Sequence, residues 1–81
     1  MTTKVLPLCE MPLGYFGLVK ELLATDRVRR RLLDLGLVTN TAVEALRKSP
    51  SGDPTAYQIR GAVIALRSEE ASQIMVEIEH S

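Results

Sequence analysis

Apolar and polar residues alternate along much of this 81-residue chain, and a two-residue period predicts β-strands. In the segment 75–79, Val76 and Ile78 alternate with acidic residues. Near the middle of the chain, Tyr57 and Ile59 lie two positions apart and therefore share one face of a strand. The pattern predicts five short strands, at 16–23, 41–48, 55–60, 63–66 and 75–79.

The first of these predicted strands carries a mixed pattern. Phe16, Leu18 and Leu22 fall on one apolar face by the two-residue period. Lys20 interrupts that face. Glycines precede and punctuate the segment, so we expect the strand to begin at a turn.

Leucine spacing predicts a helix at 26–35. Val28, Leu32 and Leu35 stand at i, i+4 and i+7 and form one stripe. Asp26, or the threonine before it, can cap the first turn. Gly36 suits the left-handed residue that ends a helix, and the leucine after it can fold back on the helix.

A second short helix is predicted at 69–74. Ser68 can cap it, and two glutamates fill its first turn, where the helix dipole favours anions. Ala71 and Ile74 would be its apolar residues. The segment 49–54, with two prolines and one glycine, predicts a loop that connects two strands.

Five strands and two helices in so short a chain predict one domain of mainly β structure, covering 1–81 with its core at about 12–79. A small sheet can protect its edges by curling on itself. We therefore expect a small barrel. A loop of Thr39 and Asn40 turns the chain after the first helix, because Asn tolerates a positive φ.

Charge and composition exclude several classes of protein. Ten Lys and Arg residues balance ten Asp and Glu, whereas nucleic-acid-binding domains are usually basic. Cys9 is the only cysteine and His80 the only histidine, so we expect neither a disulfide nor a metal site within the chain. Only weak or adventitious divalent metal binding is expected. The N-terminal segment does not have the pattern of a signal peptide, and no apolar run is long enough to enter a membrane.

The same reasoning finds no catalytic constellation. The single histidine is next to the C-terminus, so no Ser–His pair is expected, and each pair of carboxylates fits a helix cap or an outward strand face. No phosphate-binding G-x-x-x-x-G-K motif occurs. Three scattered aromatic residues do not make a groove for proline-rich peptides. We predict that the protein is not an enzyme.

An arginine cluster is the main candidate for function. Four arginines fall in five positions at 27–31, and three of them fan around the predicted helix. Three interpretations stay open: a solvated face, a docking surface for an acidic patch of a protein, or a site that binds phosphate or lipid. Arg30 and Asp34 are placed to form an i, i+4 pair. The helix and the residues just after it carry more leucines than one stripe can bury. Leu33 or Leu37 could therefore be partly exposed and contact a partner.

Several short motifs follow one another along the chain. They are RRRLLDLGL at 29–37, T-x-VE at 41–44, SPSGDP at 49–54, IRG at 59–61 and ALR at 65–67 with Ala71 following. Together they resemble the ferrous-iron transport protein A (FeoA) family, from about Pro12 to Glu79. The family commonly has Pro-Gly where this chain has Thr39-Asn40.

The resemblance implies an SH3-like barrel in the cytoplasm, recruited to the inner face of the membrane by its partner. It implies a non-catalytic accessory protein of ferrous-iron uptake that binds an FeoB-like transporter, at its GTP-binding domain or its membrane-proximal face. Two alternatives stay open: a GTPase-activating partner that supplies an arginine, or a metal-binding regulator related to the SH3-like domain of metal-dependent repressors. The candidate contact residues are Arg29, Arg30, Arg31, Leu37, Ser51, Gly52 and Asp53.

Overall fold

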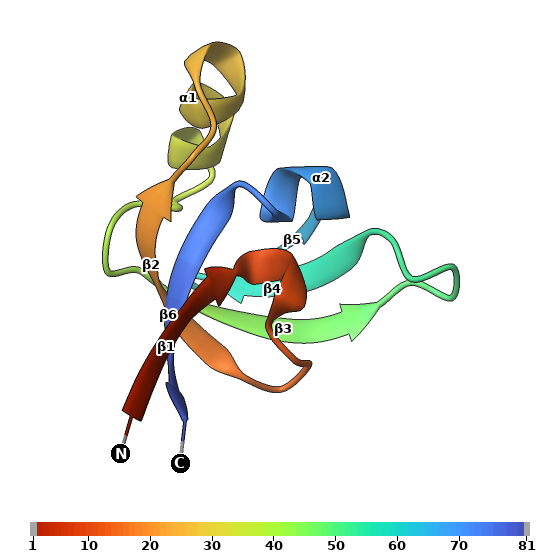
Figure 1. The fold of residues 1–81 in the computed structure, drawn as a ribbon. Coiled ribbons are helices and arrows are strands. Elements are labelled where there is room, and N and C mark those ends of the chain that lie inside the picture. Colours follow the sequence, from red (N-terminus) through yellow and green to blue (C-terminus); the bar gives the residue numbers. More distant parts are fainter. Residues whose placement is uncertain (1, 81) are drawn as a thin grey trace.

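Six antiparallel strands form one strongly bent sheet (Figure 1). The structure is a computed structural model that describes residues 2–80, and the side chains of 3–79. The strand order in the sheet is β1-β6-β2-β3-β4-β5. In chain order the elements are β1 Thr2–Pro7, the 3-10 turn η1 Leu8–Glu10, β2 Phe16–Leu22, α1 Asp26–Asp34, β3 Ala42–Lys48, β4 Thr55–Ile59, β5 Ala62–Leu66, α2 Ser68–Ala71 and β6 Ile74–His80.

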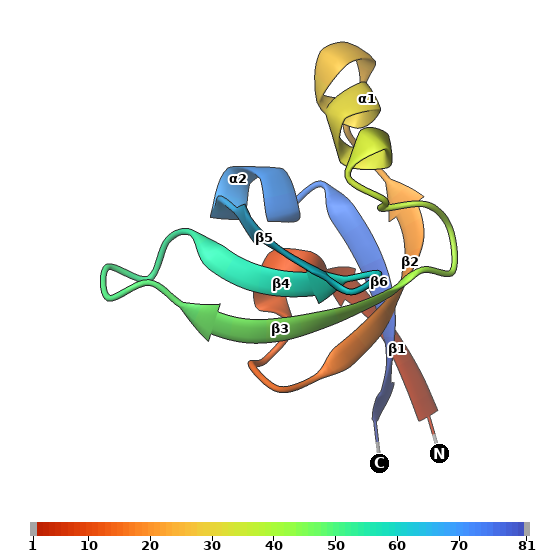
Figure 2. The same ribbon diagram turned by 180° about the vertical axis from the view of Figure 1, so that it is seen from behind.

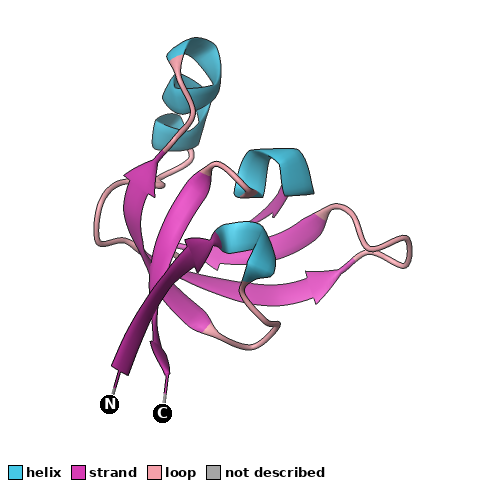
Figure 3. Cartoon of the chain, viewed as in Figure 1, coloured by secondary structure: helices cyan, strands magenta, loops and turns pink. Residues whose placement is uncertain are grey.

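The two edges of the sheet, β1 and β5, approach one another through the segments that follow them. η1 continues from β1, α2 follows β5, and these two turns of helix are in contact (Figures 1 and 3). Ala71 of α2 and Leu8 of η1 are both fully buried. β1 and β5 do not pair with each other, and the contact between the two helical turns covers the gap between the ends of these strands.

The N-terminal strand is the element that the sequence pattern did not predict. β1 pairs with β6 along its whole length, from Thr2 opposite His80 to Pro7 opposite Met75. Its sequence TTKVLP has no clear period, so its extended form depends on the partner strand. The core begins here rather than at residue 12, because Leu6, Leu8 and Met11 are buried.

The interior follows the predicted alternation in the last strand and in β4. Ile74, Val76 and Ile78 are buried between the outward residues of β6. Tyr57 and Ile59 are buried together, as expected. The other buried residues of the core are Val19, Ala24, Leu32, Leu37, Val43, Ala45, Leu66 and Ala71.

In β2 the apolar face proposed from the pattern is the outer face. Gly17 and Val19 point into the core, whereas Phe16 is 63% exposed and Leu18 39%. The reason is steric. A Cβ atom added to Gly17 would lie 2.9 Å from Sδ of Met11 and 3.0 Å from Cβ of Val76, so a larger residue would force these side chains to shift where β2 crosses the core.

The two helices form near their predicted positions. α1 ends one residue before the expected 35, and Gly36 follows with a φ of 101°. α2 is shorter than the expected 69–74, because the chain turns back at Ser72 and Ile74 already pairs with Leu22 in the sheet. The predicted turn after α1 is also present, with Asn40 at a φ of 69°.

We predict that Gly17→Ala lowers the free energy of unfolding by about 1–3 kcal/mol, because the added methyl group overpacks the contact with Met11 and Val76. Urea denaturation of both proteins measures the change.

Gly17→Ala in a Met11→Ala background is the control, because removal of the Met11 side chain relieves the shortest contact of the added methyl group. If Gly17→Ala lowers the free energy of unfolding equally in both backgrounds, the crossing at Gly17 is not tight.

Candidate functional site

Helix α1 stands apart from the sheet at one end of the molecule (Figures 1 and 2). Leu32 is its only fully buried residue within the described chain, and Val28 is 39% exposed. Leu33 and Leu35 are half-buried. The helix therefore presents most of its surface to solvent.

Leu37 does not belong to this surface. Its backbone N–H donates to the carbonyl of Leu32 at 3.1 Å, and its side chain is fully buried. The chain folds back on the helix after Gly36, as the sequence predicted for the helix end. Because that fold places Leu37 in the core, its proposed role as an exposed contact residue is wrong.

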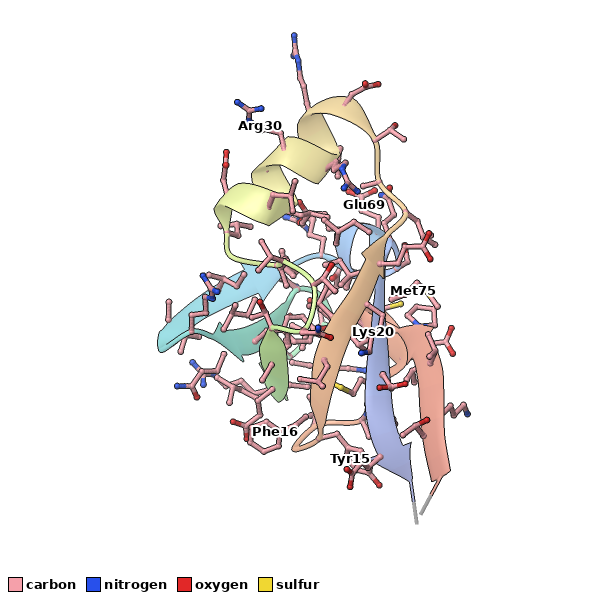
Figure 4. All side chains as sticks on the ribbon, turned by 90° about the vertical axis from the view of Figure 1, so that its left-hand side faces the viewer. Tyr15, Phe16, Lys20, Arg30, Glu69 and Met75 are labelled. Carbon is pink, nitrogen blue, oxygen red and sulfur yellow. The ribbon has the colours of Figure 1, made fainter. Side chains whose placement is uncertain are left out.

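The arginines of α1 have different surroundings. Arg31 forms an ion pair with Glu70 of α2, and Nη1 of Arg29 donates to the carbonyl of Leu22 at 3.5 Å. Within residues 3–79, Arg27 and Arg30 have no side-chain hydrogen bond or ion pair, so the predicted pair of Arg30 with Asp34 is not formed. Figure 4 shows Arg30 at the end of the molecule where α1 projects. Part of the arginine cluster thus holds the fold, and part is available to a partner.

The loop 49–54 is held by its own side chains. The hydroxyls of Ser49 and Ser51 both donate to the carbonyl oxygen of Asp53, at 2.7 and 3.0 Å. The N–H of Gly52 donates to the carbonyl of Ser49 at 2.8 Å, and Gly52 has a φ of 89°. These bonds make the exposed tip a defined shape.

Asp53 faces the protein rather than the solvent. Its Oδ1 accepts the backbone N–H of Ser68 at 2.8 Å, which places a carboxylate at the first residue of α2. At the same turn the N–H of Arg67 donates to Oε1 of Glu70 at 3.2 Å. The amide to which Asp53 bonds is fifteen residues away in the sequence, so the contact joins the loop 49–54 to α2.

The structure does not bring the two halves of the predicted contact surface together. α1 projects at one end, whereas the loop 49–54 forms the tip of the β3–β4 hairpin at another (Figures 1 and 2). α2 lies between them and is joined to both, through Glu70 to Arg31 and through Ser68 to Asp53. The exposed candidates therefore form two separate surfaces. Arg29, Arg30 and the ion-paired Arg31 lie on one, and Ser51 and Gly52 on the other.

Sequence reasoning missed one feature, a groove of about 400 Å³ at the end of the sheet away from α1. Tyr15 and Phe16 line it, with exposures of 43% and 63%. The signal available in the sequence was the adjacent pair of aromatics at the start of a strand. The hydrophobic pattern did not identify the groove, because the apolar face that carries Phe16 predicts a buried face.

Cys9 is half-buried within η1, and burial raises the pKa of its thiol, with the Glu10 carboxylate raising it further. A protonated thiol is a poor metal ligand. In residues 3–79 no group of three or more His, Cys, Asp or Glu side chains is placed to hold a metal ion. The side chain of His80, the other candidate for adventitious binding, lies outside the described residues.

Neither α1 nor α2, the α-helices of the described chain, has the length and apolar character needed to span a bilayer.

The bent sheet, with helical turns that cover the gap between its edges, defines an SH3-like β-domain protein. The FeoA domain model matches residues 6–78, so the chain belongs to the FeoA family. No functionally curated protein matches it.

Three solved structures show the same fold. FeoA from Chlorobium tepidum is 38% identical, with a TM-score of 0.84 over 90% of this chain and 70% of that one. A FeoA-like protein from Clostridium acetobutylicum is 36% identical, with a TM-score of 0.86 over 100% and 95%. FeoA from Stenotrophomonas maltophilia, complexed with zinc, is 32% identical, with a TM-score of 0.77 over 94% and 89%. The last is described as an SH3 domain protein and suggested to be a ferrous iron transport activating factor.

We expect Asp53→Ala to lower the free energy of unfolding by about 0.5–2 kcal/mol, because it removes the acceptor at the start of α2. Thermal unfolding measures this. Ser51→Ala is the control, since the hydroxyl of Ser49 still bonds to the same carbonyl. Equal melting temperatures for the two variants would show that the contact with Ser68 does not stabilise the fold.

Cys9 is expected to react with iodoacetamide with a higher pH midpoint in the folded protein than in urea, because its folded pKa is raised. Mass spectrometry of alkylation against pH gives both midpoints, and no other cysteine interferes. A lower midpoint in the folded protein would contradict the burial of this thiol.

Proposed function

We propose that this protein is a cytoplasmic, non-catalytic accessory protein of ferrous-iron uptake. It binds the cytosolic part of an FeoB-like membrane transporter and supports or regulates it by contact, without a resident metal cofactor. Membership of the FeoA family supports the iron-uptake role. The suggestion of an activating role for the S. maltophilia relative supports a transport partner.

The arrangement of α1 is the observation on which the contact proposal rests. The helix projects from the sheet, and Arg30 is exposed without an intramolecular partner in the described chain (Figure 4). Arg27, one turn earlier, is likewise exposed and has no side-chain partner within the described chain. Because exposed guanidinium groups pair readily with carboxylates, an acidic patch on the transporter's cytosolic domain fits this end of the molecule. Arg31 is already paired with Glu70 and has a structural role.

We expect Arg30→Glu to weaken binding to the transporter's cytosolic domain by roughly five- to tenfold at low salt, because it replaces attraction by repulsion. The melting temperature should stay unchanged, since Arg30 has no partner among the described residues to lose. Calorimetry or pull-down with the isolated cytosolic domain measures the effect.

Arg47→Glu is the charge-matched control, because Arg47 is exposed on β3 near the loop 49–54. If Arg47→Glu weakens binding and Arg30→Glu does not, the contact lies at the loop and the assignment to α1 fails. If neither variant changes binding, neither basic surface takes part.

A GTPase-activating role is a second candidate, favoured by the same unpaired guanidinium of Arg30. An arginine inserted into a nucleotide site can raise the rate of GTP hydrolysis by ~10³-fold or more. Arg30→Lys separates the two roles, because lysine keeps the charge but not the forked donor geometry. If the protein binds the transporter's cytosolic domain and leaves its rate of GTP hydrolysis unchanged, the accessory role is supported. If the protein stimulates hydrolysis and Arg30→Lys abolishes the stimulation, the GTPase-activating role replaces the accessory role.

A further inference from the structure

β2 and β6 separate towards the end of the sheet that lies away from α1. The last pair that joins them is Leu18 with Glu77. Beyond this pair, Phe16 pairs only with β3, whereas Glu79 pairs only with β1. The start of β2 and the end of β6 consequently diverge (Figures 1 and 2). We call this opening the β2–β6 wedge.

The wedge leaves backbone groups without a strand partner. Had the ladder between β2 and β6 continued in register, Phe16 would have faced Glu79 as the next hydrogen-bonded pair after Leu18 and Glu77. Because bonding direction alternates along a strand, the N–H and C=O groups at Phe16 and Glu79 point into the wedge. An extended segment placed there could bond to them.

One wall of the wedge is apolar and exposed. Tyr15, Phe16 and Leu18 line the groove of about 400 Å³, and they are 43%, 63% and 39% exposed. Figure 4 shows Tyr15 and Phe16 together at this end of the molecule. Adjacent aromatic side chains with so much exposed surface are typical of contact sites for proteins.

The other wall is acidic. Glu77 and Glu79 stand two residues apart on the outer face of β6, and both line the groove. One lysine compensates part of this charge, since Nζ of Lys20 lies 3.6 Å from Oε1 of Glu77. In the described chain the wedge therefore combines exposed apolar surface with excess negative charge.

We propose that the β2–β6 wedge binds an extended segment of a partner protein in which an apolar residue and a Lys or Arg stand two positions apart. Residues at this spacing share one face of a strand, as Phe16 and Glu79 share the outer face of the sheet. The backbone groups at Phe16 and Glu79 bond to the segment as a short added strand. Its apolar residues contact Tyr15 and Phe16, and its cations pair with the carboxylates of β6. This site is independent of the proposed contact through α1, which lies at the opposite end (Figure 4).

The probe is an acetylated and amidated peptide, Thr-Lys-Thr-Phe-Thr-Lys-Thr, in which the lysines and the phenylalanine share one face of an extended strand. It is titrated into the ¹⁵N-labelled full chain and followed by NMR. Saturable shifts are expected at the amides of 15–18 and 77–79, and they should weaken as salt is raised. Phe16→Ala is expected to weaken binding about tenfold or more, because it removes the main apolar contact. Glu79→Lys should weaken it by roughly five- to tenfold through repulsion.

Matched controls separate the wedge from general attraction. Val63→Ala removes a 54% exposed apolar residue from β5, and Glu69→Lys reverses a charge at the α1 end; both should leave binding unchanged. The peptide with glutamate in place of every lysine should not bind. Unchanged melting temperatures check that the variants fold. Shifts located elsewhere, or equal binding by Phe16→Ala and Val63→Ala, would overturn the proposal.

Discussion

The close crossing at Gly17 is the constraint on which the rest of the architecture depends. β2 passes so near Met11 and Val76 that a Cβ atom has no room there. This contact joins the segment after η1, β2 and β6 in one core, and it determines that Gly17 and Val19 face inward. With a two-residue period, Phe16 and Leu18 must then face outward, although both are apolar. The exposed groove at the β2–β6 wedge is a direct consequence of how the core packs.

The four-residue helix α2 has an importance beyond its length. Its first N–H bonds to Asp53 of the β3–β4 loop, and its Glu70 pairs with Arg31 of α1. It also contacts η1, where the two edges of the sheet approach. A helix this short has little intrinsic stability, so tertiary contacts must hold it. In return, it holds the loop and α1 in place relative to the sheet.

The charged groups are divided between structure and surface, and this division is relevant to function. Arg31 and Asp53 have partners within the chain, whereas Arg30 has none in the described residues. At the other end of the molecule, Glu79 lies beside exposed aromatics. A chain with no formal net charge thus presents a basic helix and an acidic groove at opposite ends. The two proposed contacts are thus far enough apart that one molecule has room for both.

Local signals in the sequence determined most of the secondary structure: the alternation in β4 and β6, the leucine spacing of α1, Gly36 at its end and Asn40 in the turn. These signals depend on neighbouring residues, so they can be read without knowing the fold. The tertiary structure decided what depends on distant segments. β1 is a strand because β6 pairs with it, β2 turns Phe16 outward because of the crossing at Gly17, and α2 ends early because Ile74 pairs with Leu22. Only the folded chain could assign Glu70 to Arg31 and the amide of Ser68 to Asp53, because these partners lie far apart in sequence.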